Sequence, residues 1–260
     1  MTPFYKFHGT GNDFIMIDGF TFKPILSASK IQEACDRHFG IGADGLIIVE
    51  PSEESDFQMI YFNSDGSKAT MCGNGARCAA AFCQMLGVTS GPINFVAGDG
   101  KHSALVEKKR EAEWEVEVSI RDVKFPTKSG DAWYINTGTH HLVKIVDNTD
   151  NVVVNEEGPL LRNDIRYKPH GVNVNWVSIS PRMIKVRTYE KGVEAETLSC
   201  GTGVTASALV AGSLTFQNVW RVETKGGVLE VSFTIEDDFF SGITLKGPAK
   251  MVFMGETSIF

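Results

Sequence analysis

The sequence predicts an α+β protein built from two related halves. Short segments of alternating apolar and polar residues dominate the chain and predict strands, while few segments have helical spacing. A Cys-Gly-x-Gly motif opens a predicted helix twice, at Cys72 and at Cys200. The two copies stand 128 positions apart in a chain of 260 residues. A separation close to half of the chain favours an internal duplication.

The predicted strands alternate in polarity and are separated by polar or glycine-containing turns. In chain order they are Phe14–Ile17, Leu46–Val49, Gln58–Phe62, Trp114–Ile120, Leu142–Val146, Ile184–Tyr189, Val228–Phe233 and Met251–Met254.

Three helices are predicted. Ser29–His38 follows serines that can cap a helix and ends just before Gly40. Cys72–Leu86 has apolar residues at helical spacing. Gly201–Leu214 consists of small residues on every side, which suits a helix enclosed tightly by strands. The apolar face of the second helix comprises Cys78, Ala79, Phe82, Cys83 and Leu86.

Each half follows one order: a strand, a polar loop with a glycine, Cys-Gly-x-Gly and a helix. Charged residues and a proline accumulate between Ile120 and Ser129, which places the boundary there. We expect an N-terminal half over 1–120 and a C-terminal half over 121–248. The residues alone allow the last strand, 249–260, to join either half.

Composition excludes several classes of partner. Lys and Arg number 25 against 32 Asp and Glu, a net charge of −7, which argues against nucleic acid or an anionic membrane as the main partner. No apolar run approaches the ~20 residues of a membrane-spanning helix. The first residues lack the features of a signal peptide, and five cysteines are too few for a disulfide framework. We therefore expect a cytoplasmic protein.

The repeated cysteine suggests proton transfer at a stereocentre. A helix N-terminus favours the thiolate, and the adjacent glycines let backbone N–H groups approach a ligand anion. Two such helix ends could hold one substrate carboxylate and place a sulfur on each face of its α-carbon. One thiolate would then remove the α-proton while the opposite thiol donates one, with the two sulfurs titrating as a pair.

Other interpretations of the cysteines remain open at this point. Cys-Gly-x-Gly can also be a tight loop–helix junction with a structural cysteine. Spacings of five and four residues between Cys72, Cys78 and Cys83 do not favour zinc, so we expect no metal site. The motif also fails as a phosphatase loop, a P-loop or a dinucleotide fingerprint. Cys35, Cys78 and Cys83 are predicted to be core residues.

Five segments resemble the diaminopimelate epimerase family, and they occur in the family's order. Cys-Gly-Asn-Gly-x-Arg-Cys, within the fourth, is highly specific. The segments are His8–Phe14, Arg37–Gly45, Phe62–Ser67, Met71–Cys78 and Thr197–Gly203.

The resemblance implies an isomerase that interconverts LL- and meso-diaminopimelate by a two-base mechanism, in lysine and peptidoglycan-precursor synthesis. No cofactor is implied, and pyridoxal phosphate is not used. The implied fold has two pseudosymmetric halves, each a mostly antiparallel sheet or barrel wrapped round a central helix. The last strand, 249–260, is implied to return to the first half, and the protein is implied to be a homodimer.

The resemblance also assigns residues. Cys72 and Cys200 match the acid/base cysteines. The helix-start backbone donors for the substrate carboxylate match Gly73, Asn74, Gly201 and Thr202. The substrate-contacting asparagines match Asn12, Asn63 and Asn173, whose amides both donate and accept. An asparagine beside a glycine is otherwise most often a turn residue.

Three positions depart from the family pattern. Glu190-Lys191-Gly192 stands where the family has Glu-Arg-Gly, and lysine lacks the planar geometry with which arginine holds a distal carboxylate. Thr139 replaces an asparagine before the family histidine, His141; we expect both to shape the site, although a structural histidine is an equal alternative. Gly45 stands where some members carry glutamine.

Two other functions stay open on the sequence. One is a related two-cysteine racemase or isomerase acting on another amino acid. Proline and hydroxyproline racemases share the two-thiol design but lack Gly-Asn-Asp-Phe and Phe-Asn-Ser-Asp-Gly. The other is a non-catalytic amino-acid-binding protein, which the presence of both cysteines disfavours.

Overall fold

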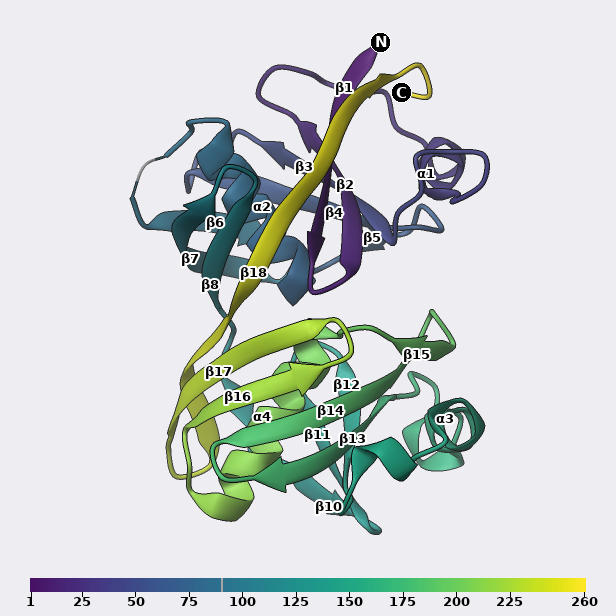
Figure 1. Ribbon diagram of the computed structural model, residues 1–260, viewed down its shortest axis with the longest axis vertical. Coiled ribbons are helices and arrows are strands. Elements are labelled where there is room, and N and C mark those ends of the chain that lie inside the picture. Colours follow the sequence, from purple (N-terminus) through teal and green to yellow (C-terminus); the bar gives the residue numbers. More distant parts are fainter. Residues whose placement is uncertain (90) are drawn as a thin grey trace. The chain divides into compact units, whose positions relative to one another are not determined.

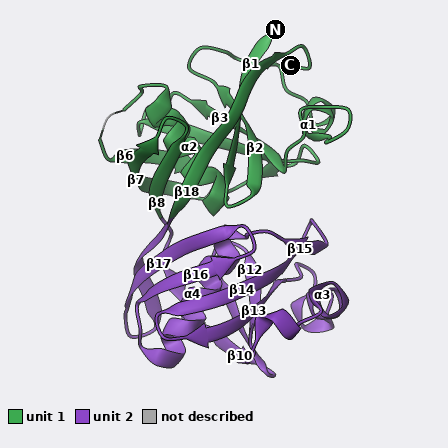
Figure 2. Cartoon of the chain, viewed as in Figure 1, with its two compact units in different colours: residues 1–118, 247–260 green, residues 119–246 purple. Residues whose placement is uncertain are grey.

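The structure is a computed structural model and describes residues 1–89 and 91–260. The chain divides into two compact units (Figure 2). Unit 1 consists of Met1–Val118 and Gly247–Phe260, and unit 2 of Ser119–Lys246. The boundaries expected from the sequence, after residues 120 and 248, lie two residues later than these. The last strand contributes to both units, and its C-terminal part belongs to unit 1.

Unit 1 is a closed barrel of eight strands among the described residues (Figure 1). Neighbouring strands pair antiparallel except β2–β3 and β4–β6, which are parallel. β18 pairs with β8 on one side and with β1 on the other, which closes the ring. The barrel strands are β1 (Thr2–Gly9), β2 (Asn12–Asp18), β3 (Gly45–Glu50), β4 (Phe57–Asn63), β6 (Ile93–Ala97), β7 (Gly100–Arg110), β8 (Glu113–Ser119) and β18 (Phe239–Thr257). A short strand, β5 (Lys68–Ala69), adds to β4.

Helix α2 (Gly73–Met85) packs against β1, β2, β3, β4 and β7 and is buried over its first eleven residues. Alanines, glycines and cysteines predominate in this stretch, so the surrounding strands approach the helix closely. Burial of residues on all sides of a helix is expected only where other elements enclose it. The helix predicted over Cys72–Leu86 is therefore confirmed to within one residue at each end.

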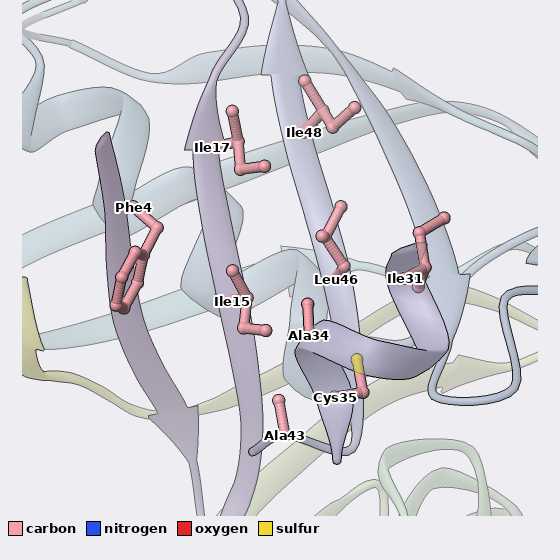
Figure 3. Close-up of a cluster of buried hydrophobic side chains, with 9 residues drawn as sticks. All are labelled: Phe4, Ile15, Ile17, Ile31, Ala34, Cys35, Ala43, Leu46 and Ile48. Carbon is pink, nitrogen blue, oxygen red and sulfur yellow. The ribbon is translucent and has the colours of Figure 1, made fainter. Parts of the chain in front are cut away.

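Helix α1 (Ala28–Cys35) covers a second apolar cluster of unit 1, shown in Figure 3. Ile31 and Ala34 pack there with Ile15 and Leu46 from β2 and β3. The predicted helix, which ran to residue 38, was too long. It stops at Asp36, whose carboxylate accepts the backbone N–H groups of residues 38 and 39 and so starts a turn.

Unit 2 repeats the strand order of unit 1. Here β12–β13 and β14–β16 are the parallel pairs, corresponding to β2–β3 and β4–β6. At the two ends of this sheet, β9 pairs with β18 and β10 pairs with β11. The strands are β9 (Val123–Lys124), β10 (Thr127–Ser129), β11 (Ala132–Asn136), β12 (His140–Ile145), β13 (Asn173–Ser180), β14 (Met183–Glu190), β15 (Ala195–Thr197), β16 (Val219–Thr224) and β17 (Gly227–Ile235). The predicted fold of two related α+β halves is confirmed.

Helix α4 (Gly201–Thr215) is the helix enclosed by the strands of unit 2, as α2 is the helix enclosed by the strands of unit 1. It packs against β11 to β14, β16 and β17. The hydroxyls of Thr205 and Ser207 donate to carbonyls one turn back, which satisfies two buried polar groups inside the helix. A side chain at Gly203 or Gly212 would overlap its neighbours, so the small residues predicted here are needed for the close approach of the strands.

The sequence missed several elements. Helix α3 (Val154–Arg162) contains Gly158 and Pro159, both poor helix residues, and Gly158 is required because a side chain there would overlap Tyr189.

The predicted strand Met251–Met254 is only part of the long strand β18. The other seven predicted strands lie within observed ones or overrun them by one residue. Short 3₁₀ helices span Thr149–Asn151 and Ile165–Tyr167. None of the helices in the described residues could span a membrane.

Candidate active site

In unit 1, three of the predicted site residues lie together at the start of α2. Cys72 is the N-cap of the helix, and its Sγ accepts the backbone N–H of Gly75 at 3.5 Å. The same sulfur lies 3.6 Å from Asn12 Oδ1, to which it donates. Asn74 Nδ2 donates to that oxygen at 3.2 Å. The first turn of the helix thus presents a sulfur, an amide and backbone donors at one place.

Charged residues hold Asn12 in place. Asn12 Nδ2 donates to Asp44 Oδ2 at 2.8 Å, and Arg37 bridges Asp44 and Asp13 with both contacts at 2.7 Å. Burial would raise the pKa of Asp13, but hydrogen bonds from Arg37 and Lys6 outweigh it and hold that pKa at about 2. Asp13, Arg37 and Asp44 occur in the segments that resemble the family, yet no individual role was predicted for any of them.

Arg77 is a second support that sequence reasoning missed. Its side chain is fully buried, and burial lowers its pKa. Nη2 donates to Asn74 Oδ1 at 2.8 Å and Nη1 to Gly73 O at 3.2 Å. Both contacts fix the first turn of α2. The guanidinium therefore orients the Asn74 amide so that its Nδ2 faces Asn12.

Asn63 lies at the end of β4, paired with Gly45 of β3. Its Nδ2 donates to Ser67 Oγ at 3.0 Å, within the turn after the strand. Among the described residues, the side-chain hydrogen bond of Asn63 stays within this turn and does not connect it to the group around Cys72. At Gly45 a Cβ would lie 2.5 Å from Phe62 O, so this backbone requires glycine, whatever other family members carry.

In unit 2, Cys200 is the N-cap of α4 and is buried. Its Sγ lies 3.5 Å from Thr202 Oγ1. Thr137 Oγ1 donates to the backbone carbonyl of Thr202 at 3.0 Å and holds the first turn of the helix. Gly201 and Thr202 provide first-turn N–H groups, which have no acceptor inside the helix. This arrangement corresponds to that at the start of α2.

His141 and Thr139 join the group around Cys200. Thr139 Oγ1 lies 2.9 Å from His141 Nε2 and 3.1 Å from Thr202 Oγ1. Asn173 Nδ2 donates to the same hydroxyl at 3.3 Å. His141 is fully buried, and burial, with smaller effects from the charges of His140 and Lys191, lowers its pKa to about 3. Its imidazole is therefore neutral at ordinary pH.

Glu190 and Lys191 lie at the end of β14. The backbone N–H of Lys191 donates to Asn173 Oδ1 at 2.8 Å, and its Nζ donates to His170 O at 3.1 Å. The structure thus places Asn173 between Thr139 and the backbone of Lys191. Glu190 is half-buried and pairs with Ala195 of β15.

The other three cysteines are buried, as predicted. Burial raises the pKa of Cys35 to about 11 and the pKa values of Cys78 and Cys83 to about 12. They are thiols under ordinary conditions. Among the residues that the structure describes, no group of three or more His, Cys, Asp or Glu side chains could hold a metal ion.

Comparison with known families extends the resemblance over almost the whole chain. The family described as "Diaminopimelate epimerase" matches residues 4–125 and 133–252. The chain belongs to the diaminopimelate epimerase family.

Named members of the diaminopimelate epimerase family are similar along their full length. The diaminopimelate epimerase of Flavobacterium psychrophilum is 44% identical, over 98% of this chain and 99% of the relative. That of Chlorobaculum tepidum is 38% identical, over 96% and 99%. The resemblance inferred from the five segments is confirmed, and the chain is an isomerase.

Solved structures show how far the fold of this diaminopimelate epimerase family member is shared. A phenazine biosynthesis protein of the PhzF family from Bacillus anthracis has a TM-score of 0.73 at 14% identity, covering 98% of each chain. A hydroxyproline epimerase from Agrobacterium vitis also reaches 0.73, at 12% identity, over 98% of this chain and 91% of its own. At these identities the likeness concerns the fold alone.

Proposed function

We propose that this protein interconverts LL- and meso-diaminopimelate without a cofactor, using Cys72 and Cys200 as a pair of acid/base groups. One observation carries the proposal: each unit encloses a helix whose N-cap is a cysteine followed by Gly-x-Gly. Family membership supports the substrate. The mechanism follows from the chemistry of the two helix ends.

The reaction requires a carbanion next to a carboxylate, which is unfavourable in water. Donors fixed in advance at the position where charge develops stabilise such an intermediate. The N-terminal turns of α2 and α4 supply backbone N–H groups from Gly73, Asn74, Gly201 and Thr202. The carboxylate of the reacting centre binds there, one sulfur removes the α-proton, and the other donates a proton to the opposite face.

The rest of the substrate carries a second ammonium and a second carboxylate. Asn12, Asn63 and Asn173 offer amides that donate to carboxylate and accept from ammonium. Glu190 supplies a negative charge for an ammonium group, and Lys191 a positive charge for the distal carboxylate. Thr139 and His141 shape the wall beside Cys200.

The proposal also includes a metabolic role, a location in the cell and an oligomeric state. The expected role is in lysine and peptidoglycan-precursor synthesis, in the cytoplasm, by a homodimer. The acidic net charge is compatible with a small charged substrate rather than a polyanionic partner. Sedimentation of the purified protein over a range of concentrations tests the dimer, and a mass of one chain at all concentrations contradicts it.

Hydrogen exchange at the α-carbon tests the reaction. Reduced protein is incubated with LL-diaminopimelate in deuterated water with no added cofactor. We expect α-deuterium in the substrate pool and formation of the meso isomer. Cys72→Ala and Cys200→Ala should each slow the interconversion by ~10²–10⁴-fold, because each removes one proton-transfer group. Cys35→Ala, a core cysteine, is the matched control and should retain activity.

A related racemase of another amino acid is the second candidate. The likeness to a hydroxyproline epimerase, at 12% identity, concerns the fold alone, so this candidate enters only as an outcome of the exchange experiment. Exchange with proline or another amino acid, but none with diaminopimelate, would establish that alternative. Absence of exchange with any amino acid in the folded, reduced protein would overturn both.

A further inference from the structure

A cavity of about 330 Å³ lies on the outer face of the sheet of unit 2. It is bounded by β10, β11 and the start of β12 (Figure 1), and by residues 166–172, which lead into β13. Successive residues of a strand point to opposite faces, so His140, which lines the cavity, shares its face with Leu142, which packs with Val154 of α3. Helix α4 is enclosed by the other face. The described residues that line the cavity include none of those used in the proposed reaction, so the cavity needs a separate explanation.

Positive charge predominates around this cavity. Lys128, Arg166 and Lys168 line it, and the described residues that line it include no Asp or Glu. Arg166 is paired with a carboxylate, since its Nε and Nη2 donate to Asp164 at 3.0 and 2.8 Å. Lys128 Nζ lies 4.5 Å from the ring centre of Trp133, and Lys168 is exposed. Three cations against this one carboxylate leave two positive charges, in a chain whose net charge is −7. Such a local excess attracts an anion.

The donors of the cavity suit a phosphate better than a carboxylate. Arginine holds a carboxylate through two parallel N–H groups, and Arg166 already uses two of its nitrogens on Asp164 in this way. Each lysine is a point charge with three donors, which fits the tetrahedral oxygens of a phosphate. Ser129 Oγ and Tyr167 Oη lie 2.6 Å apart and share one hydrogen, so the second hydrogen of this pair can be donated to a ligand oxygen.

Four of the lining residues carry rings, and the rings form one continuous stack. Tyr167, Tyr134, His140 and His170 follow one another with ring centroids 6.1, 5.9 and 5.4 Å apart and planes within 24° of parallel. Arg166 covers the Tyr167 end, at 5.3 Å from the ring centre. The His170 end is exposed. Offset stacks of this spacing are favourable for aromatic pairs, so a flat ring of a ligand can extend the stack at His170.

Hydrogen bonds hold both sides of the cavity in place. The contact between Ser129 and Tyr167 joins β10 to the 3₁₀ helix opposite. The backbone N–H of Gly171 donates to Tyr167 O at 2.7 Å and closes the turn between them. Lys191 Nζ donates to His170 O at 3.1 Å and fixes the end of the stack. A cavity held in this way loses little conformational entropy when a ligand binds.

The volume limits the ligand to a small molecule, because pockets for small ligands begin at about 300 Å³. We propose that the cavity binds a phosphate monoester that carries an aromatic ring. Lys128 and Lys168 hold the phosphate, and the ring continues the stack that ends at His170. Nucleoside monophosphates and simpler aromatic phosphates share this chemistry. The site lies outside the proposed reaction, so the proposal does not depend on the substrate of that reaction.

Isothermal titration calorimetry with two probes tests the class of ligand. Adenosine 5′-monophosphate and phenyl phosphate distinguish a nucleotide from a simpler aromatic ester, and at least one of them should bind once per chain with a Kd below about 1 mM. Ribose 5-phosphate lacks the ring and should bind roughly tenfold more weakly than the tighter probe, because it cannot stack. Binding weaker than this Kd by both probes, or equal binding of ribose 5-phosphate, would overturn the proposal.

Substitutions of exposed lining residues test the location. Lys128→Gln combined with Lys168→Gln should weaken binding of the tighter probe roughly tenfold, because both charged donors to the phosphate are lost. His170→Ala should weaken the same probe but leave ribose 5-phosphate unchanged. All three side chains are exposed, so the fold does not depend on them. Lys185→Gln, at an ion pair with Asp150 elsewhere in unit 2, is the matched control. An equal loss in the control would assign the binding to overall charge and overturn the location.

Competition separates this cavity from the site of the proposed reaction. Diaminopimelate should not displace the bound probe, since the described lining residues include none proposed to hold that substrate. The double lysine variant should also retain α-hydrogen exchange with diaminopimelate at the rate of the unmodified protein. Competitive displacement, or loss of exchange in the double variant, would make the cavity part of the substrate site and overturn the proposal.

Discussion

At the residue scale, the positions with a motif around them were predictable and those without one were not. Cys72, Asn12 and Asn74 could be selected because the resemblance surrounds them, and the structure brings them together. Asn175 and Thr188 could not, because a polar residue within a strand pattern has no local signature. Their contacts are made between strands, which only the folded unit brings together.

Lys191→Arg should lower the KM for diaminopimelate several-fold while leaving kcat nearly unchanged. The guanidinium can hold a carboxylate through two parallel hydrogen bonds, which an ammonium cannot do. The backbone N–H of residue 191 keeps its bond to Asn173 Oδ1 whichever side chain is present. Steady-state kinetics measure both constants. Lys185→Arg, at an exposed ion pair with Asp150, is the control; an unchanged KM in Lys191→Arg would show that this lysine does not contact the distal carboxylate.

At the element scale, the three helices with clear spacing or caps were predictable, and α3 was not. Gly158 and Pro159 disfavour a helix locally, but Gly158 lets α3 approach Tyr189 of β14. Tertiary packing therefore overrides propensity here. The length of β18 was also missed, because the dipeptide Gly247-Pro248 is typical of a turn between two elements. Its pairing with β8 and β1 carries the strand through that point.

Gly203→Ala tests how closely α4 and β13 approach each other. Alanine alone would favour the helix by about 1 kcal/mol. In this position its Cβ would overlap Asn175 Oδ1, a buried atom bonded to Thr188. Overpacking typically costs about 1–3 kcal/mol, so we expect a net destabilisation, measured by urea unfolding. Gly91→Ala, where a Cβ would meet open space, is the control. Equal or greater stability in Gly203→Ala would show that β13 moves enough to accommodate the added methyl group.

At the scale of the whole molecule, buried titratable groups predict how stability depends on pH. His141, with a pKa of about 3 in the folded state against 6.5, binds its proton more readily when unfolded, so stability falls as pH drops below 6.5. Asp13, held at about 2 against 3.8, adds to this loss at lower pH. The three core thiols, raised to about 11 or 12 from 9.0, lose their protons more readily when unfolded, so stability also falls above pH 9.

Stability should therefore reach a plateau between about pH 6.5 and 9, measured as the free energy of unfolding in urea across a pH series. Replacing His141 with glutamine should flatten the decline between pH 6.5 and 3. Glutamine carries no titratable proton, so any remaining decline there comes from the other groups with lowered pKa values: His8 and His140, whose pKa values are lowered by burial first of all, and carboxylates such as Asp13. An equally steep decline in His141→Gln would show that this ring does not govern acid stability.

The duplicated fold has a chemical consequence that oxidation can reveal. If the reaction uses one sulfur from each unit on one α-carbon, the chain must allow both sulfurs to approach that carbon, and we expect the same freedom to let them meet when substrate is absent. A disulfide requires Cβ atoms within roughly 4.5 Å, so oxidation of the ligand-free protein should join Cys72 to Cys200 and abolish activity. Reductant should restore activity, and diaminopimelate bound beforehand should slow the loss. Peptide mass spectrometry identifies the link, and Cys83→Ala should form it unchanged. Oxidised, inactive protein without this link would contradict a two-sulfur site at one carbon.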